Sequence, residues 1–184
     1  MSLKIIPNGG RNEDGSLRTL SRWTFEYEPA REIVEDYIHG PDGYRVLNAC
    51  AGRTKLDTPV EVVRNDLNPE IDADLHVDVA EIDEHVEEAF DAILFDPPFD
   101  ETQAEEKYDG MHAGDVYSAL EAFRALSHMN TVVLCFGWNS WGMQSFDEFD
   151  REQTILLQRG PCLRDVIVTV DRRNTGSLRT EGYP

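Results

Sequence analysis

The stretch that decides the fold of this chain is Ala92-Ile93-Leu94-Phe95-Asp96-Pro97-Pro98-Phe99. Its first half is a short apolar run of the kind that forms a buried strand. Its second half ends that strand, because proline has no N–H to donate to a ladder and fixes its own φ. The two prolines form a stiff turn in which a carboxylate and a carbonyl oxygen can face one small donor group, and the aromatic ring that follows can cover a flat molecule. We therefore expect a fixed acidic turn at the carboxyl end of a buried strand.

Strands and helices alternate on both sides of this stretch. Apolar residues at helical spacing predict helices over residues 28–38 and 115–129 and a short acidic helix over 81–90. Apolar and β-branched runs predict strands over residues 45–49, 60–63, 74–79, 91–95, 131–136, 154–158 and 166–170. This order indicates an α/β fold: a doubly wound, Rossmann-like, seven-stranded and mostly parallel sheet with an antiparallel C-terminal strand pair.

The length and composition favour one intracellular domain. The 184 residues suit a single domain over 1–184, with 1–21 and 172–184 irregular. No run of 18 apolar residues suggests a membrane span, and the first residues have no apolar signal core. The cysteines at 50, 135 and 162 are odd in number and lack Cys-x-x-Cys spacing, which favours buried free thiols. The five histidines lack metal-ligand spacing, so we expect no metal site.

The net charge of −19 is extreme for a chain of this size. The 36 acidic residues are dispersed, and only three of the 17 basic residues are lysines, at 4, 55 and 107. Such a surface resembles that of proteins from extreme halophiles, where molar salt shortens the Debye length to about 3 Å and screens the repulsion. We therefore expect a cytoplasmic protein of a haloarchaeon or of its virus. At high salt the charge neither excludes nor supports a nucleic-acid partner, because both repulsion and counterion release weaken.

Four predicted strands end in distinctive residues. The strand over 45–49 runs into Cys50, Ala51 and Gly52, the next into Asp66 and Leu67, the third ends near Asp78, and the fourth ends in the acidic turn. Ligands of doubly wound sheets bind at the carboxyl ends of the strands. Acids gathered there oppose one another's ionisation unless something uses them.

The first of these strand ends is a poor cradle for a dinucleotide. A pyrophosphate needs closely spaced glycines over a helix N-terminus, whereas Gly52 stands alone. S-adenosylmethionine (SAM), which has no phosphate, suits it better. Asp66 can accept hydrogen bonds from both ribose hydroxyls, Asp78 can accept one from the adenine amine, and Leu67 can pack on the adenine face.

Together these segments resemble the class I SAM-dependent methyltransferases, in particular the DNA adenine-N6 amino-methyltransferases with an Asp-Pro-Pro-aromatic motif. The resemblance covers roughly residues 23–171. Val46 to Gly52 resembles their first motif, with Asn48 where an Asp is common. The resemblance implies catalytic residues at Asp96, Pro97, Pro98 and Phe99. It implies cofactor-binding residues at Phe25, Tyr27, Asn48, Ala49, Cys50, Gly52, Asp66, Leu67, Asp78 and Val79.

The resemblance implies transfer of the SAM methyl group to an exocyclic base amine. The Asp96 carboxylate and the Pro97 carbonyl would accept the two N–H groups of the amine and localise its lone pair, and Phe99 would stack on the base. A base inside a duplex would first be flipped out. Trp138 and Trp141 either stack on the base or pack the floor of the site.

The substrate expected first is adenine N6 in DNA, with DNA preferred to RNA as partner. Guanine N2 of ribosomal RNA is the alternative within enzymes, since the same motif occurs there. A SAM-binding or structural accessory protein without catalysis is the alternative from another class. No target-recognition insert is evident beyond the loop over 100–113, the tryptophan turn and the C-terminal tail. Either target recognition is short and loose, or a homodimer or a recognition partner supplies it.

Overall fold

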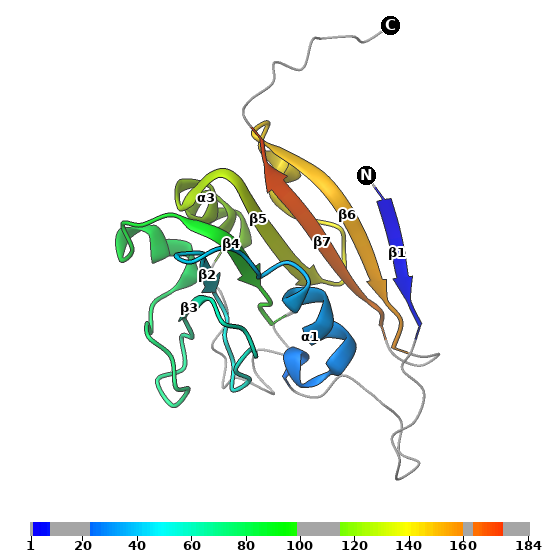
Figure 1. The fold of residues 1–184 in the computed structure, drawn as a ribbon, viewed down its shortest axis with the longest axis horizontal. Coiled ribbons are helices and arrows are strands. Elements are labelled where there is room, and N and C mark those ends of the chain that lie inside the picture. Colours follow the sequence, from blue (N-terminus) through cyan, green and yellow to red (C-terminus); the bar gives the residue numbers. More distant parts are fainter. Residues whose placement is uncertain (1, 8–22, 99–114, 160–163, 175–184) are drawn as a thin grey trace, which may run out of the picture.

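Seven strands form a single sheet. The computed structural model describes residues 2–7, 23–98, 115–159 and 164–174 (Figure 1). The strand order is β1-β6-β7-β5-β4-β2-β3. The bounds are β1 Ser2–Ile6, β2 Arg45–Asn48, β3 Glu61–Arg64, β4 Phe90–Phe95, β5 Ser127–Gly137, β6 Phe149–Leu157 and β7 Val166–Arg173. Strands β3, β2, β4 and β5 run parallel to one another, whereas β7 is antiparallel to both β5 and β6. The expected α/β fold is confirmed, including the antiparallel C-terminal pair.

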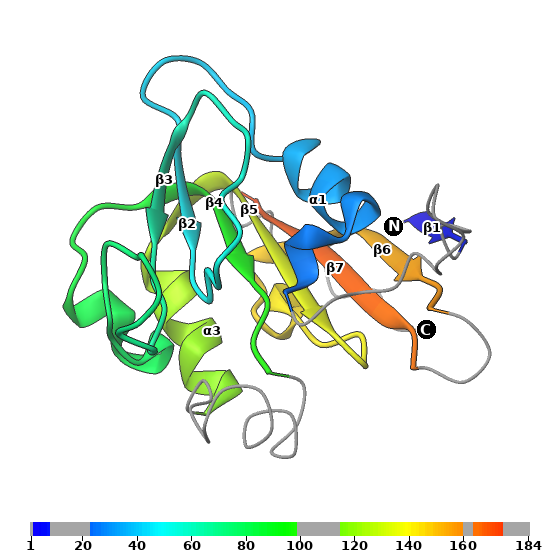
Figure 2. The ribbon, with the colours of Figure 1, turned by 90° about the horizontal axis from the view of Figure 1, so that it is seen from below.

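Helical segments cover both faces of the sheet. The α-helix α1, Glu28–Glu35, lies on one face, and α3, Val116–Ala125, lies on the other (Figure 2). Short 3-10 turns are η1 Thr24–Glu26, η2 Val79–Glu84 and η3 Met143–Ser145. Among the described residues, no helix is long and apolar enough to span a bilayer.

Successive side chains along the central strands point to opposite faces of the sheet, which produces two hydrophobic cores. Val46 of β2 and Leu94 of β4 point to the α1 face and pack with Ile33 and Val34. Their neighbours in the sequence, such as Leu47, join the core on the α3 face. Because both faces are covered, β2 and β4 read as continuous apolar runs, as buried parallel strands do.

The predicted strand over residues 74–79 is wrong. Only Leu75 pairs, in an isolated parallel bridge with Asn65. The aspartates of this segment bind backbone N–H groups instead of leaving them to a ladder. Asp74 Oδ2 accepts from Arg64 N at 2.8 Å, and Asp78 Oδ1 accepts from Ala80 N at 3.0 Å. Such local side-chain bonds compete with strand pairing.

The seventh strand comes from the N-terminus, which was expected to be irregular. Residues 2–6 form β1 and pair in parallel with β6, far away in the sequence. Its Leu3 and Ile5 side chains are 67% and 54% exposed, so burial does not mark the strand. The pairing instead depends on a partner edge more than a hundred residues away, which local patterning does not reveal.

Other boundaries also differ from the predicted ones. The helix expected over 81–90 is the short turn η2, and the helix expected over 115–129 ends at Ala125, where β5 soon begins. Strand β6 begins five residues before the expected 154, and Arg172 and Arg173 belong to β7 and not to an irregular tail. Phe99, the loop over 100–113, Cys162 and residues 175–184 lie outside the described residues.

Candidate active site at the carboxyl ends of the strands

The carboxyl ends of β3, β2, β4 and β5 meet at one edge of the sheet. Asn48, the last residue of β2, is paired with Arg64 at the end of β3 and with Leu94 near the end of β4. Phe95 of β4 is paired with Cys135 near the end of β5. The segments that follow these strands therefore lie side by side, as the sequence predicts.

Asn65 joins three of these segments. It is 1% exposed, and its Nδ2 donates to the carbonyl oxygens of Ala49 at 3.0 Å and Val77 at 3.1 Å. Its Oδ1 accepts from Val77 N at 3.1 Å. Because the amide is saturated by backbone groups, it fixes the loop after β2 against the segment that leads to Asp78. Asn65 was not among the predicted site residues, although an Asn directly before the predicted ribose-binding acid was a usable signal.

Gly52 closes the loop after β2 in a conformation that suits glycine, with φ at +57°. Its N–H donates to Asp66 Oδ2 at 2.8 Å, and its carbonyl accepts from Arg64 Nη2 at 2.7 Å. A Cβ at this position would lie 2.7 Å from the Trp23 ring. Asp66 and Arg64 thus hold this loop, and the Trp23 ring, for which the sequence left packing and base stacking open, covers it.

Asp66 holds its neighbourhood through both oxygens. Oδ2 accepts from Gly52 and Oδ1 accepts from Asn68 N at 3.0 Å. Each carboxylate oxygen has a second lone pair, so the group keeps acceptor capacity for a ligand. Leu67 beside it is 37% exposed, as a residue that packs on a ligand face would be.

Three carboxylates act on one thiol at this edge. Burial, and then the charges of Asp66, Asp96 and Asp78, raise the pKa of Cys50 well above its ordinary value. The three acids come from the ends of β3 and β4 and from the start of η2. All three acids therefore lie near enough to Cys50 to affect its pKa. The thiol itself is therefore protonated and is no nucleophile.

The Asp96 turn stands on a rigid base. The fully buried Phe95 ring packs edge-on against Phe123 of α3, with centroids 5.0 Å apart, and against Trp141, with centroids 5.5 Å apart. Pro97 is buried and Asp96 is half-buried. Trp141 therefore packs the floor beneath the turn, which decides between the two roles considered for it.

Four predicted cofactor residues lie in the core. Phe25 and Tyr27 are 3% and 6% exposed beneath the sheet edge, and Phe25 packs on Phe136 with centroids 5.4 Å apart. Ala49 and Val79 are 1% and 3% exposed. These four side chains are therefore buried in the two hydrophobic cores.

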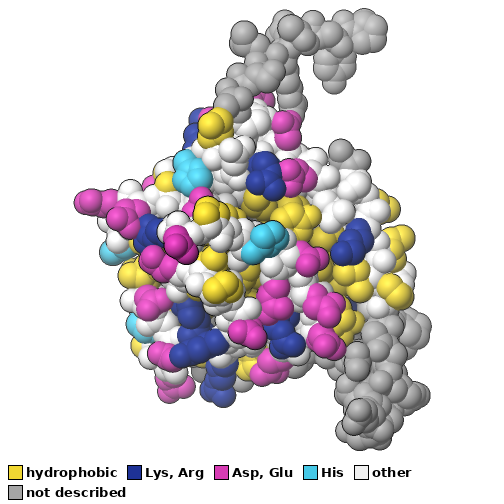
Figure 3. Space-filling model, in the orientation of Figure 1, with side chains coloured by type: hydrophobic (Ala, Val, Ile, Leu, Met, Phe, Trp, Pro, Cys, Tyr) yellow, Lys and Arg dark blue, Asp and Glu magenta, His cyan; other side chains and the backbone are white. Residues whose placement is uncertain are grey.

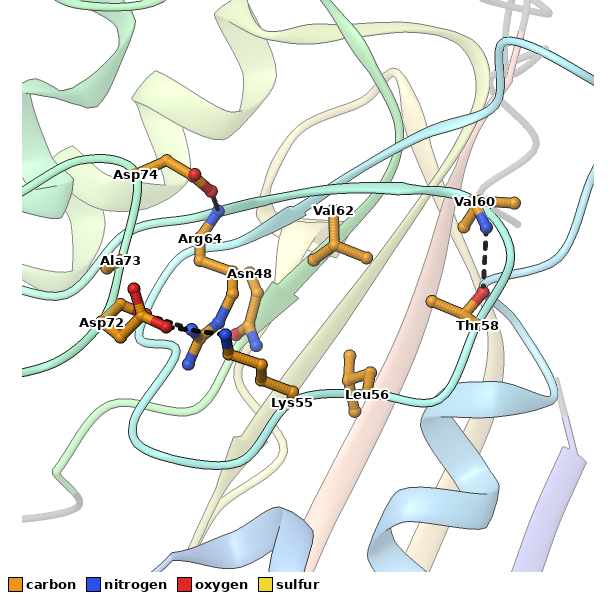
Figure 4. A pocket seen from close by; sticks show the side chains of 10 residues that line it. All are labelled: Asn48, Lys55, Leu56, Thr58, Val60, Val62, Arg64, Asp72, Ala73 and Asp74. Carbon is orange, nitrogen blue, oxygen red and sulfur yellow. Dashed lines mark hydrogen bonds and ion pairs between the residues drawn. The ribbon is translucent and has the colours of Figure 1, made fainter.

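Asn48 faces a cavity of about 290 Å³ beside the loop after β2 (Figure 4). Its side chain is 1% exposed, and neither its oxygen nor its nitrogen has a hydrogen-bond partner among the described residues. Leu56, Val60 and Val62 form the apolar side of this cavity. An unpaired buried amide is costly and marks a site that a polar group would complete.

The opposite side of this cavity is charged. Lys55 pairs with Asp72, with Nζ 2.6 Å from Oδ2, and Arg64 lies next to them (Figure 4). The Lys55 ammonium holds the pKa of Asp72 below its usual range. In the part of the chain that the structure describes, no three His, Cys, Asp or Glu side chains are grouped to hold a metal ion.

The fold is similar to that of several solved methyltransferases. TrmN from Thermus thermophilus matches with a TM-score of 0.57 at 14% identity, over 78% of this chain and 48% of that one. This chain thus spans about half the length of TrmN. A putative rRNA methylase from Clostridium thermocellum matches with a TM-score of 0.55 at 10% identity, over 78% and 95%.

A third similar structure contains a bound product. It is Burkholderia thailandensis 1,6-didemethyltoxoflavin-N1-methyltransferase with S-adenosylhomocysteine, at a TM-score of 0.56 and 17% identity over 80% and 77% of the two chains. No protein-family model matches the sequence, and no curated protein matches it. At these identities the likeness shows the fold alone, which is the Rossmann-like fold of class I SAM-dependent methyltransferases.

Proposed function

We propose that this chain transfers a methyl group from SAM to an exocyclic amine of a nucleic-acid base. The observation that carries the proposal is the convergence of Asp66, Asp78 and Asp96 around Cys50 at the carboxyl edge of this fold. Three carboxylates at one edge of the sheet give that edge a negative potential, which a cationic ligand complements. SAM is such a ligand, because its reactive methyl is carried on a positively charged sulfur.

The donor half of the site lies over β2 and β3 in this proposal. The Asp66 carboxylate accepts the ribose hydroxyls with its remaining lone pairs, and Leu67 packs on the adenine face. Asp78 accepts from the adenine amine. The backbone of Ala49, Cys50 and Gly52 approaches the donor closely.

Residues of the core and of the cavity beside the loop after β2 also contribute to the donor half of the site. Phe25, Tyr27 and Val79 hold the donor-binding loops in place from the core. The Asn48 amide, whose oxygen and nitrogen have no partner among the described residues, offers an NH2 donor group and a carbonyl acceptor to a polar group at the loop.

The acceptor half is the Asp96-Pro97-Pro98-Phe99 turn. The Asp96 carboxylate and the Pro97 carbonyl accept the two N–H groups of the amine, which turns its lone pair toward the methyl group. Phe99 covers the base. The rigid seat of Phe95 between Phe123 and Trp141 favours this role, because catalysis by positioning requires a turn that does not move.

Adenine N6 in DNA is the substrate that we put first, since Asp at the head of this motif goes with adenine in the family that the sequence resembles. Guanine N2 of ribosomal RNA is the second candidate. Two proteins of similar fold, a putative rRNA methylase from Clostridium thermocellum and an rRNA methylase from Streptococcus thermophilus, favour keeping this second candidate. We further propose that the protein works in the cytoplasm of a haloarchaeon or of a cell infected by its virus, and that a second copy or a recognition partner selects the target.

Labelled SAM tests this function directly. The protein is incubated at molar KCl with methyl-labelled SAM and either genomic DNA or ribosomal RNA, and calorimetry measures SAM binding in parallel. We expect label on DNA in N6-methyladenine. Label on RNA alone would replace the DNA assignment by guanine N2, and SAM binding without label on either polymer would favour the accessory role.

A further inference from the structure

Two arginine–tryptophan pairs lie at the same edge of the sheet as the candidate site. The Arg53 guanidinium stands over the Trp23 ring, with Cζ 5.6 Å from the ring centroid. Trp23 in turn contacts Gly52 in the loop after β2. This pair therefore lies over the carboxyl end of β2.

The second pair lies over the carboxyl end of β5. Trp138 directly follows Gly137, the last residue of β5, and Arg164 stands over its ring with Cζ 4.2 Å from the centroid. Arg164 precedes β7, which runs antiparallel to β5 with Ile167 opposite Gly137. Arg164 is thus carried past the end of β5 from the neighbouring strand.

The Asp96 turn lies between the two pairs. In the sheet, β4 is the strand between β2 and β5. Neighbouring strands are about 4.8 Å apart, so β2 and β5 are separated by about 10 Å. Stacked nucleotides rise about 3.4 Å each along a strand, so about three nucleotides span this width. A target base held at Asp96 would have its neighbours near the two pairs.

These arginines differ in their partners from others in the structure. Arg31, Arg45, Arg124, Arg151 and Arg172 each pair with a carboxylate. Arg53 and Arg164 are both exposed, and among the described residues each has a ring and no carboxylate as its partner. In a chain with 36 acidic residues, two arginines that keep their full charge at one edge form a local site for an anion.

We infer that the Arg53–Trp23 and Arg164–Trp138 pairs bind the nucleotides on either side of the target in an unpaired nucleic-acid segment. This inference rests on the proposed function, which makes the ligand a nucleic acid. A guanidinium stacked on a ring is a flat, preorganised cation. A base stacks on the face of the guanidinium that is turned away from the ring, and the in-plane N–H groups of the guanidinium donate to a phosphate. Single-strand sites commonly combine positive charge with aromatic platforms in this way.

Fluorescence anisotropy tests the inference without any methyl transfer. The probes are fluorescein-labelled, unstructured nine-nucleotide DNA and RNA of the same sequence, titrated with the whole protein between 0.3 and 2 M KCl. The double variant Arg53→Gln/Arg164→Gln should bind at least tenfold more weakly, and its log–log salt slope should fall by about 1.4, the value for two phosphate contacts on a single strand. Arg53→Lys/Arg164→Lys, which keeps the charge and loses the planar stack, should lie between the double variant and the wild type.

Arg31→Gln/Arg172→Gln is the matched control, because it also removes two positive charges, on α1 and on β7 opposite Val132 of β5, and it should bind like the wild type. The inference is overturned if Arg53→Gln/Arg164→Gln binds both probes within twofold of the wild type, or if the control variant loses as much affinity as Arg53→Gln/Arg164→Gln does. A difference between the DNA and RNA probes identifies the polymer. Methyl transfer measured with the same protein variants separates the two proposals. Binding that depends on the arginines, without transfer, supports this inference and contradicts the proposed function. Transfer whose KM does not change in the arginine variants supports the proposed function and contradicts this inference.

Discussion

Cys50 reports the electrostatics of the candidate site at the scale of a single residue. The surrounding carboxylates favour the neutral thiol, so removing one of them should lower the Cys50 pKa and raise the thiolate fraction at any given pH. Asp66→Asn should therefore speed alkylation of Cys50 by iodoacetamide several-fold at pH 8. Peptide mass spectrometry measures this rate separately from the other two cysteines.

A distant acid gives the control for that measurement. Asp147→Asn changes the charge equally at an exposed position, and it should leave the Cys50 rate unchanged. An unchanged rate in Asp66→Asn as well would mean that the acids do not converge on the thiol, and the main support for a cationic donor would be lost.

Asp96 is the residue whose removal separates chemistry from donor binding. Its carboxylate is proposed to touch the acceptor amine and not the donor, so Asp96→Ala should abolish transfer while the Kd for SAM stays within a few-fold of the wild-type value. Transfer is measured with labelled SAM and the Kd by calorimetry. Full activity in this variant would remove the proposed mechanism.

Asn48 should show opposite effects on stability and on binding. A buried amide with two unpaired atoms costs roughly 1–3 kcal/mol per unsatisfied group, and the adjoining cavity leaves room for a larger apolar side chain. Asn48→Leu should therefore raise the free energy of unfolding by about 1 kcal/mol and weaken SAM binding. Urea denaturation measures the stability and calorimetry measures SAM binding. A variant that is less stable than the wild type and binds SAM normally would contradict both expectations.

At the scale of elements, the sequence was a good guide to the central sheet and a poor one to its edges. Strands β2, β4 and β5 are buried on both faces, so their apolar runs mark them plainly. Residues 74–79 alternate like a strand, yet their aspartates bind local N–H groups, and the periodicity does not distinguish these outcomes. Strand β1 has no buried face, so only its distant partner β6 defines it.

The candidate site shows the same division. The acids at the strand ends follow from chain order once the parallel sheet is assumed, and the structure brings Asp66, Asp78 and Asp96 together as expected. Asn65 was missed, and the role of Trp23 was left open between packing and base stacking, because their contacts are to segments that are distant in the sequence. Contacts of this kind cannot be predicted from local spacing.

The turn that carries Trp138 and Trp141 is held by a buried ion pair between β6 and β7. Arg151 and Asp171 have side chains 4% and 0% exposed; Asp171 Oδ2 also accepts from Met143 N at 2.8 Å, and Arg151 Nη2 donates to the Ser140 carbonyl at 3.3 Å. Asp171→Asn leaves a buried, uncompensated guanidinium and should cost about 3 kcal/mol of unfolding free energy. Chemical denaturation measures the loss.

Glu152→Gln is the paired comparison for that variant. It breaks the Arg172–Glu152 pair, whose side chains are 37% and 38% exposed, and such a pair is worth only about 0–1 kcal/mol. Equal losses in the two variants would mean that burial does not give the Arg151–Asp171 pair its importance for the turn.

At the scale of the whole molecule, the acidic charge is spread over the surface and is not concentrated in one element. Figure 3 shows Asp and Glu side chains scattered over the visible face, with few lysines and arginines between them. With a net charge of −19, the acidic side chains repel one another in the folded state and lower its stability. Salt should relieve that repulsion, because the Debye length falls from about 10 Å at 0.1 M to about 3 Å at 1 M.

The melting temperature should therefore rise steeply with KCl between 0.1 and 1 M. The slope should be smaller in a variant with Asp83, Glu84 and Glu87 replaced by their amides, since these exposed acids account for three of the charges and leave −16 from −19. Circular dichroism melts of both proteins at each salt concentration measure the slopes, and melts in sucrose, which stabilises without screening, separate charge from preferential exclusion. A flat salt response, or equal slopes in the two proteins, would show that surface repulsion does not limit the stability of this fold and would remove the physical basis for assigning it to a high-salt cytoplasm.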